Sequence, residues 1–387
     1  MSLADALPQL LQSGETGLLQ LLHALGLAQD VHGQPAWPFA RRIATETLAL
    51  DAGLARQLAW ALAGLVLALL LGALGAARRR ARTAAWSVAA LVLLALPWPD
   101  TTLVLGAAQA TSFHRSPIDF DARAIAAGRT LYDVHCASCH GADGRGEGPR
   151  AASLPTWPPR LDGALLGRRA EGEVFATILH GMHGRDGTPT MPGVDGRLAD
   201  AQVWSLMAAM KALAAGAAVR AEAAWAEPVR APDALVHCDD GAPDRALRRF
   251  QGQRLRIVAA GGAGPAPTED PRLVTIVLRP ADAPDAAGAT GQAGCSIADS
   301  AAWAAYAEVG GVAPRRLAGA QFIVDRDGWL RAYAGPGRAG WSQDDFVCRS
   351  ARPERRAAPG RDGLGDLIAA IDADPIRRGA LGFAHRP

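Results

Sequence analysis

The chain is organised around the stretch Tyr132-Asp-Val-His-Cys136-Ala-Ser-Cys139-His140, which contains a Cys-x-x-Cys-His motif. This motif is typical of sites where a haem is attached covalently to the chain. Cys136 and Cys139 would form thioethers with the two vinyl groups of the haem, and His140 would bind the iron through its imidazole Nε2. The spacing is short because both sulfurs and the imidazole must reach one porphyrin from a single turn of chain. The sequence therefore predicts one covalently bound haem, with iron as its metal.

Two other kinds of site also use a Cys-x-x-Cys pair. A redox-active dithiol of the thioredoxin type should follow a strand, whereas this motif follows a helix-like stretch. A zinc site needs two further ligands, usually a second pair of Cys or His residues, and none lies at suitable spacing nearby. The flanking sequence favours haem over both alternatives.

The segment before the motif has the pattern of a helix. Asp121 is a suitable N-cap for a helix over residues 122–134. Gly128 and Tyr132 are four residues apart and therefore share one face of that helix. A glycine on a helix face lets a second helix approach closely.

A partner helix is predicted from Asp200 to Leu213, with Trp204 on its apolar face. The two segments resemble the N-terminal and C-terminal helices of class I cytochromes c, which cross at a glycine and an aromatic residue. The resemblance implies an all-α class I cytochrome c domain, to which we assign residues 120–215.

The resemblance also implies a carbonyl partner for the proximal histidine. In class I cytochromes c a proline carbonyl accepts the Nδ1–H of this residue, which makes the imidazole a stronger ligand and fixes its plane. Pro159, or else Pro158, is expected to do this for His140. The intervening glycine-rich segment 141–149 does not fit a phosphate loop, since it lacks a preceding strand and a Lys-Ser/Thr pair.

A second axial ligand is expected from the segment Gly187-Thr-Pro-Thr-Met191-Pro-Gly193. It resembles the Met-Pro loop that presents a thioether to the distal face of the haem in this family. Met191 is therefore the predicted sixth ligand of the iron. A thioether favours ferrous iron and raises the reduction potential relative to two histidine ligands. Met182, His180 and His183 remain competitors.

Two apolar segments precede this region. Gln57–Ala77 carries no formal charge and is long enough to cross a hydrocarbon core of ~30 Å as a helix. A second apolar run extends from Ala84 to about Ala108 and is interrupted by Pro97-Trp98-Pro99-Asp100. Four arginines lie between the two runs: Arg78, Arg79, Arg80 and Arg82. We therefore predict two transmembrane helices within residues 56–108, joined by an arginine-rich turn.

The arginine-rich turn also predicts the orientation. Arginine-rich connections stay in the cytoplasm, so the N-terminal segment and everything after residue 108 should lie outside. The resemblance implies the same topology, because c-type haem is attached on the outer side of the bacterial inner membrane. Residues 1–55 lack the basic start of a cleaved signal peptide, and we expect an amphipathic helix at 7–27 on or beside the membrane.

The C-terminal region, residues 234–387, follows a low-complexity linker at 214–233. Its pattern predicts two strands, a helix, a β-hairpin with an Asp-Arg-Asp-Gly turn and a last helix, at residues 254–260, 273–278, 300–309, 319–333 and 364–373. This order resembles the thioredoxin-like fold, so an α/β thioredoxin-like domain is expected. The segment 259–267 contains no cysteine where thioredoxins carry Cys-x-x-Cys, which argues against dithiol catalysis there.

Three cysteines remain: Cys238, Cys295 and Cys348. In an oxidising compartment we expect a Cys238–Cys295 or Cys295–Cys348 disulfide. The alternative is a copper site formed by the segment His237-Cys238-Asp-Asp240 and Cys295, since thiolate and imidazole suit Cu(I).

The whole arrangement resembles the cytochrome-c-fused members of the copper-resistance protein D family, although that family's large multi-helix copper domain is missing. We expect a multi-domain, membrane-anchored c-type cytochrome with one haem c that transfers single electrons in the periplasm, an electron carrier rather than a catalyst. Its expected partners are the lipid bilayer and redox proteins of the periplasm or membrane. The net charge of +2 gives no sign of nucleic-acid binding. Haem-assisted copper handling, or a haem subunit of a larger oxidoreductase, are the alternatives.

Overall fold

The computed structural model divides the chain into two units. The first comprises Met1–Arg115, Arg169–Glu173 and Gly379–Phe383, and the second comprises Ser116–Arg168, Val174–Arg378 and Ala384–Pro387. The structure describes residues 3–77, 82–163, 166, 169–222, 225, 227–261, 270–282, 294–336, 364–378 and 384–385.

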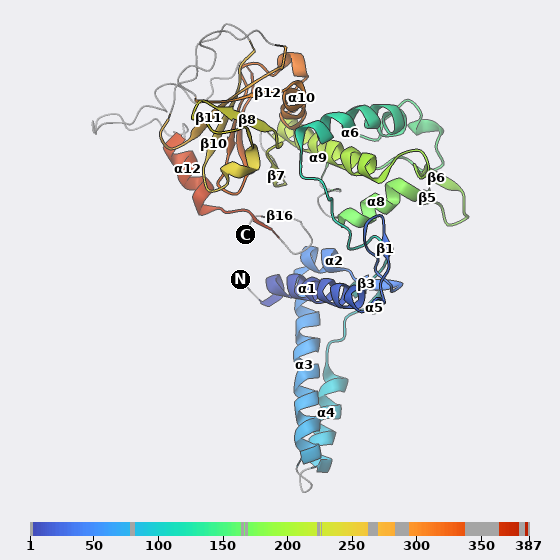
Figure 1. Ribbon diagram of the computed structural model, residues 1–387. Helices are drawn as coiled ribbons and strands as arrows, with labels where there is room; N and C mark the ends of the chain where they lie inside the picture. Colours follow the sequence, from blue (N-terminus) through green and yellow to red (C-terminus); the bar gives the residue numbers. More distant parts are fainter. Residues whose placement is uncertain are drawn as a thin grey trace. The chain divides into compact units, whose positions relative to one another are not determined.

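The first unit is mainly helical, with two short strand pairs (Figure 1). Its helices are α1 (Leu3–Ala24), α2 (Thr45–Leu50), α3 (Ala52–Ala77), α4 (Arg82–Ala95) and α5 (Thr101–Val104). The paired strands are β1 (Asp30–Val31) with β2 (Gln34–Pro35), and β3 (Arg41–Ile43) with β4 (Leu105–Ala107). The predicted helix at 7–27 is confirmed as α1.

Helices α3 and α4 lie side by side as a helical hairpin (Figure 1). Their approach is close: a Cβ on Gly75 would lie 2.9 Å from the Cβ of Ala85. Large apolar side chains of the hairpin are exposed, among them Trp60, Val66, Leu67, Leu69, Leu70, Leu74, Trp86, Val88, Leu91 and Leu94.

The first predicted apolar helix is present as α3, but the second differs from the prediction. Helix α4 ends at Ala95 rather than near residue 108. Leu96 precedes Pro97, and a residue before proline is disfavoured in the helical conformation. Asp100 then caps the separate helix α5 through the backbone N–H of Thr102 at 2.8 Å. The arginines Arg78, Arg79 and Arg80 lie outside the described residues.

By length and composition, two of the described helices could cross a membrane. They are α3 and the Asp200–Ala221 stretch of α9 (Asp200–Glu222). In α3 only 17% of the apolar window is buried, whereas in α9 the share is 67%. Helix α9 is therefore a core helix of the second unit.

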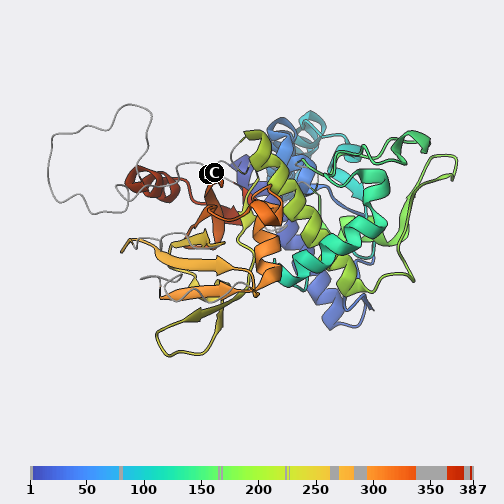
Figure 2. The same cartoon turned by 90° about the horizontal axis from the view of Figure 1, so that it is seen from above.

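The second unit begins with the helices around the motif (Figure 2). These are α6 (Ala122–His135), α7 (Ala137–His140), the 3-10 turn η2 (Ala151–Ser153), α8 (Glu171–His180) and α9, with a hairpin of β5 (Gly181–His183) and β6 (Pro189–Pro192) between α8 and α9. Asp121 caps α6 by accepting from the N–H groups of Arg123 and Ala124, as predicted. Trp204 is buried on α9 and stacks on Phe175 with ring centroids 4.5 Å apart.

Helices α6 and α9 cross at the predicted glycine. A Cβ on Gly128 would lie 1.9 Å from the backbone oxygen of Ser205. No side chain fits at that distance, so the crossing needs glycine at this position.

The rest of the second unit is built on a curled eight-stranded sheet. Its strand order is β7-β14-β13-β10-β11-β12-β8-β9, and only the pairs β10–β11 and β11–β12 are parallel. The strands are β7 (Val229–Arg230), β8 (Leu235–Cys238), β9 (Arg245–Ala246), β10 (Leu255–Ala259), β11 (Val274–Arg279), β12 (Cys295–Ala298), β13 (Gln321–Val324) and β14 (Trp329–Ala334). The described residues of this unit also form two further helices, α10 (Ser300–Val309) and α12 (Leu364–Ala373), and the 3-10 turns η4 (Leu247–Phe250) and η5 (Pro314–Arg316). A last strand pair joins β15 (Arg377–Arg378) to β16 (Ala384–His385).

The predicted elements of this region are confirmed as β10, β11, α10, the β13–β14 hairpin and α12. The sequence did not predict β7, β8, β9 and β12. Each has only two to four residues, and β8 carries His237 in its interior. Such short strands form because long-range pairing stabilises them, and their own residues give little periodicity.

One hydrophobic core joins the motif helices to the sheet. It contains Ile125 of α6, Val219 of α9, Tyr306 of α10 and Phe322 of β13. Helix α9 continues to Glu222, beyond its predicted end at Leu213 and into the segment predicted as a linker. Ala and Gly residues allow this, because they are small: a Cβ on Gly216 would lie 2.0 Å from the Glu308 backbone oxygen. The predicted limits of the cytochrome c domain, 120–215, and of the C-terminal domain, 234–387, stay a prediction.

Candidate functional site

Helix α7 positions the three residues of the motif. Cys136 is the C-cap of α6 and the N-cap of α7, and its carbonyl accepts hydrogen bonds from the N–H groups of Cys139 at 3.1 Å and His140 at 2.9 Å. Cys139 and His140 therefore follow Cys136 by one helical turn and lie on the same face as it. This is the arrangement that two thioethers and one axial imidazole on a single porphyrin require.

The two thiols are half-buried and are not bonded to one another. Burial, and next the neighbouring Cys139, raise the pKa of Cys136 to about 11. A reactive dithiol needs a lowered thiol pKa, usually from a nearby positive charge. The surroundings of Cys136 therefore do not favour the dithiol interpretation.

His140 is held by the carbonyl that the resemblance implied. Its Nδ1–H donates to the oxygen of Pro159 at 3.2 Å, and Pro159 rather than Pro158 makes this contact. This bond leaves Nε2 as the lone-pair nitrogen. Burial lowers the pKa of His140 by more than the Pro159 contact raises it, which favours the neutral ring. A neutral imidazole with free Nε2 is the form that binds iron.

The glycine-rich segment folds back onto α7 and brings Pro159 to the histidine. The N–H groups of Gly146 and Gly148 donate to the carbonyls of His140 at 2.8 Å and Cys139 at 3.0 Å. A Cβ on Gly146 would lie 2.4 Å from the Pro158 oxygen, and Gly146 has a φ of +80°. Glycine is therefore required at this position, where two backbone segments approach closely. Together, the residues of the site fit a covalently bound haem.

Tyr132 fixes the start of the same loop. Its side chain is 1% exposed, and its hydroxyl donates to the Gly141 carbonyl at 2.8 Å. Tyr132→Phe should lower the free energy of unfolding by about 1 kcal/mol, because it leaves the Gly141 oxygen without this donor. Denaturant unfolding followed by haem absorbance measures the change, and an unchanged midpoint would contradict it. Thr130→Ala on the same helix is the control, since Thr130 is exposed.

Met191 lies in β6, directly opposite Met182 in β5. Directly opposite residues of an antiparallel pair point to the same face, so the hairpin presents both thioethers together. Met191 is half-buried, and Met182 is 45% exposed. His180 ends α8 and His183 ends β5. The structure thus brings Cys136, Cys139, His140 and Pro159 together by direct contacts, and the role of Met191 stays a prediction.

Arg129 is a residue of this region that the sequence analysis missed. Its guanidinium donates to the Ala142 carbonyl at 2.9 Å, directly after the motif, and pairs with Glu308 of α10 at 3.1 Å. It thereby ties the loop that follows His140 to the C-terminal part of the second unit. The only signal in the sequence was Asp133 at the i+4 position, with which Arg129 also pairs at 3.0 Å.

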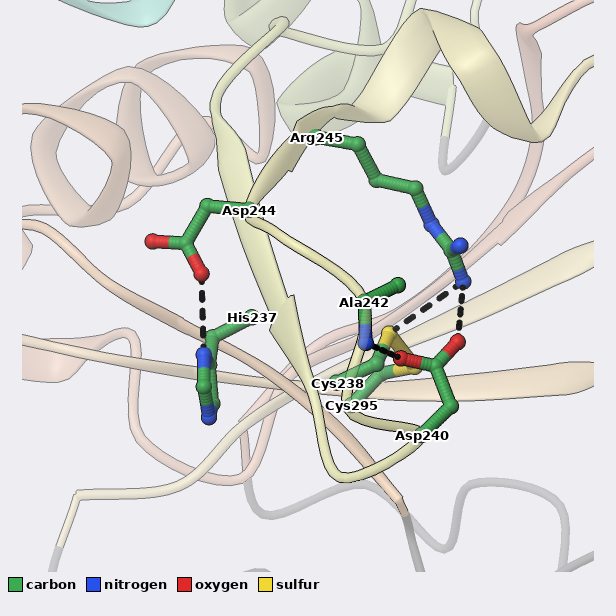
Figure 3. The surroundings of a disulfide bond; sticks show 7 residues. All are labelled: His237, Cys238, Asp240, Ala242, Asp244, Arg245 and Cys295. Carbon is green, nitrogen blue, oxygen red and sulfur yellow. Dashed lines mark hydrogen bonds and ion pairs between the residues drawn. A yellow bond between two sulfur atoms is a disulfide. The ribbon is translucent and has the colours of Figure 1, made fainter.

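Two of the three remaining cysteines form the first of the two predicted alternatives, a Cys238–Cys295 disulfide (Figure 3). The Nδ1 of His237 lies 2.8 Å from a carboxylate oxygen of Asp244. Across the residues that the structure describes, no group of three or more His, Cys, Asp or Glu side chains could hold a metal ion. Neither the zinc alternative nor the copper alternative gains support from the described residues. Cys348 lies outside these residues.

Comparison with known proteins supports the assignment of the motif. The sequence profile of the cytochrome c family matches residues 125–214, which include all five predicted site residues. This segment is less than half of the chain. The chain therefore contains a cytochrome c domain at residues 125–214, which implies covalently attached haem c and a role in electron transfer.

Among solved structures, the chain is similar to a protein of the reducing HAO-like protein complex of Kuenenia stuttgartiensis. The identity is 24%, the TM-score is 0.23, and the match covers 32% of this chain and 59% of that one. Among curated proteins no match is found.

Proposed function

We propose that the protein is a membrane-anchored electron carrier with a single haem c, ligated by His140 and Met191. One observation supports it most: α7 and its N-cap Cys136 present Cys136, Cys139 and His140 on one face, and Nδ1 of the buried histidine is held by Pro159. The bound haem supplies one-electron chemistry between ferric and ferrous iron.

Each residue of the site has a separate task in this proposal. Cys136 and Cys139 would hold the porphyrin by thioethers. Pro159 orients the His140 ring through its carbonyl, at 3.2 Å from Nδ1. Met191 would bind the iron together with His140, so no position would remain for a substrate and the haem would supply electron transfer alone.

We also propose that α3 and α4 anchor the chain in the bacterial inner membrane. Helix α3 has 26 residues, so it is about 39 Å long at 1.5 Å per residue, against a hydrocarbon core of ~30 Å. Large exposed apolar side chains on both helices support insertion, since water disfavours such a surface. With the arginine-rich turn in the cytoplasm, the haem and the C-terminal region would be periplasmic.

The C-terminal region is proposed to be thioredoxin-like without catalytic thiols. The order of β10, β11, α10, the β13–β14 hairpin and α12 supports this resemblance. Copper handling is not proposed, because Cys238 and Cys295 are bonded to each other.

The sixth ligand can be tested with carbon monoxide, which binds ferrous haem only where an axial position is open. The ferrous wild-type protein should bind no stoichiometric CO under native conditions, whereas Met191→Ala should bind one equivalent. Met182→Ala is the matched control on the same hairpin and should behave as the wild type. Stoichiometric binding by the wild type would refute the carrier proposal, and CO binding by Met182→Ala alone would make Met182 the ligand.

A further inference from the structure

The Cys238–Cys295 disulfide joins two neighbouring strands near one end of the sheet. Strand β8 pairs antiparallel with β12, and Cys238 lies directly opposite Cys295. Among the described strands, β9 alone lies beyond β8 in the strand order. The backbone also connects the strands, since the N–H of Asp239 donates to the Gly294 carbonyl at 2.7 Å. Strand pairing therefore does not depend on the sulfur–sulfur bond alone.

The two cysteines of this bond are not equally exposed. Cys238 is 5% exposed, whereas Cys295 is half-buried. An attacking thiolate must approach along the line of the bond to one of the sulfurs. The more exposed Cys295 is therefore the accessible target, and Cys238 would be the leaving group.

A fixed positive charge lies beside the leaving sulfur (Figure 3). Nη2 of Arg245 is 3.7 Å from Sγ of Cys238. The guanidinium is held in place by Asp240, at 3.0 Å, and by the ring of Phe250, 4.6 Å from its central carbon to the centroid. A neighbouring cation stabilises a thiolate, and a better-stabilised leaving thiolate speeds exchange.

The surface around the bond carries acidic groups. Asp239, Asp240 and Asp244 are exposed there, and Asp240 offsets part of the charge of Arg245. A partner with basic residues around its thiols would be attracted to this surface, and an acidic one repelled.

We propose that Cys238–Cys295 is a thiol–disulfide exchange site that accepts two electrons from a dithiol protein with a basic surface around its thiols. A partner thiolate attacks Sγ of Cys295, the Cys238–Cys295 bond breaks, and Cys238 leaves as a thiolate beside Arg245. The second partner thiolate then attacks the partner's own sulfur in the mixed disulfide and releases Cys295. The partner becomes a disulfide, and its two thiol protons end on Cys238 and Cys295, so electrons and protons balance.

The direction of attack can be tested on the full-length chain with its haem attached. The probe is a peptide with one thiol, Cys-x-x-Ser flanked by lysines, added under native conditions and followed by rapid alkylation. Peptide-resolved mass spectrometry should find the probe on Cys295 and the alkyl label on Cys238. The reverse distribution, or reaction only after denaturation, would overturn the proposal and leave a purely structural disulfide.

The roles of charge can be tested with two reduced Cys-x-x-Cys peptides, one flanked by lysines and one by glutamates. The lysine peptide should open the disulfide several times faster at low salt. Arg245→Gln should slow the reaction about threefold to tenfold, and Arg245→Lys should retain most of the rate. Arg249→Gln is the control with the same loss of charge, because Arg249 is an exposed neighbour in the chain that makes no contact with the disulfide among those the structure describes. Equal rates for Arg245→Gln and Arg249→Gln, or for the two peptides, would overturn the proposal.

Discussion

Replacing Cys136 and Cys139 together with alanine should give a chain that carries no covalently bound haem. Both thioethers depend on these sulfurs, and α7 places the two sulfurs on the face that also carries His140. The test is in-gel haem staining after denaturing electrophoresis, on protein made in a host with haem-attachment machinery. The stain should disappear completely in the double variant.

The matched control removes the other two described cysteines. Cys238→Ser with Cys295→Ser also deletes two sulfurs, but from the sheet, and this variant should stain as the wild type does. Covalent haem in the Cys136→Ala/Cys139→Ala chain would show that the haem is attached elsewhere and would refute the assignment of the site.

Gly128→Ala should lower the free energy of unfolding by about 3 kcal/mol, the upper end of the usual cost of overpacking. In an open helix the same change stabilises by roughly 1 kcal/mol, so the sign of the effect is diagnostic. The new Cβ would lie 1.9 Å from the Ser205 oxygen, and this oxygen belongs to the backbone of α9. Helices α6 and α9 would have to separate. Because α7 follows α6 directly, its position would change as well.

Guanidinium unfolding followed by haem absorbance measures this loss of stability in the cytochrome c domain. Gly163→Ala is the control from the same region, because a Cβ at Gly163 would meet no described atom within 4 Å beyond its neighbours in the chain. It should unfold at the wild-type midpoint or slightly above. A Gly128→Ala variant as stable as Gly163→Ala would mean that the two helices do not approach as closely as described.

The parts that could be predicted from the sequence are those whose chemistry is local. The motif at 136–140 specifies its own helical turn, and Gly128 and Tyr132 mark one face of one helix. The β13–β14 hairpin could also be predicted, because its turn is stabilised locally. The carboxylate of Asp325 accepts hydrogen bonds from the N–H groups of Asp327 and Trp329.

The parts that could not be predicted depend on residues far apart in the chain. Arg129 and Glu308 are 179 positions apart, and nothing near either residue indicates the pair. The alanine-rich segment after Leu213 has the composition of a linker, yet it continues α9 because the core around α10 accepts small side chains. The short strand β12 exists because β11 and β8 pair with it on either side.

The most direct test of the central claim is the iron and copper content per chain, measured on full-length protein from a host that attaches haem. One iron and no copper per chain is the predicted result. It should be accompanied by a covalent haem that survives denaturation. A chain without iron, or with zinc in its place, would contradict the haem assignment and the electron-carrier proposal that rests on it.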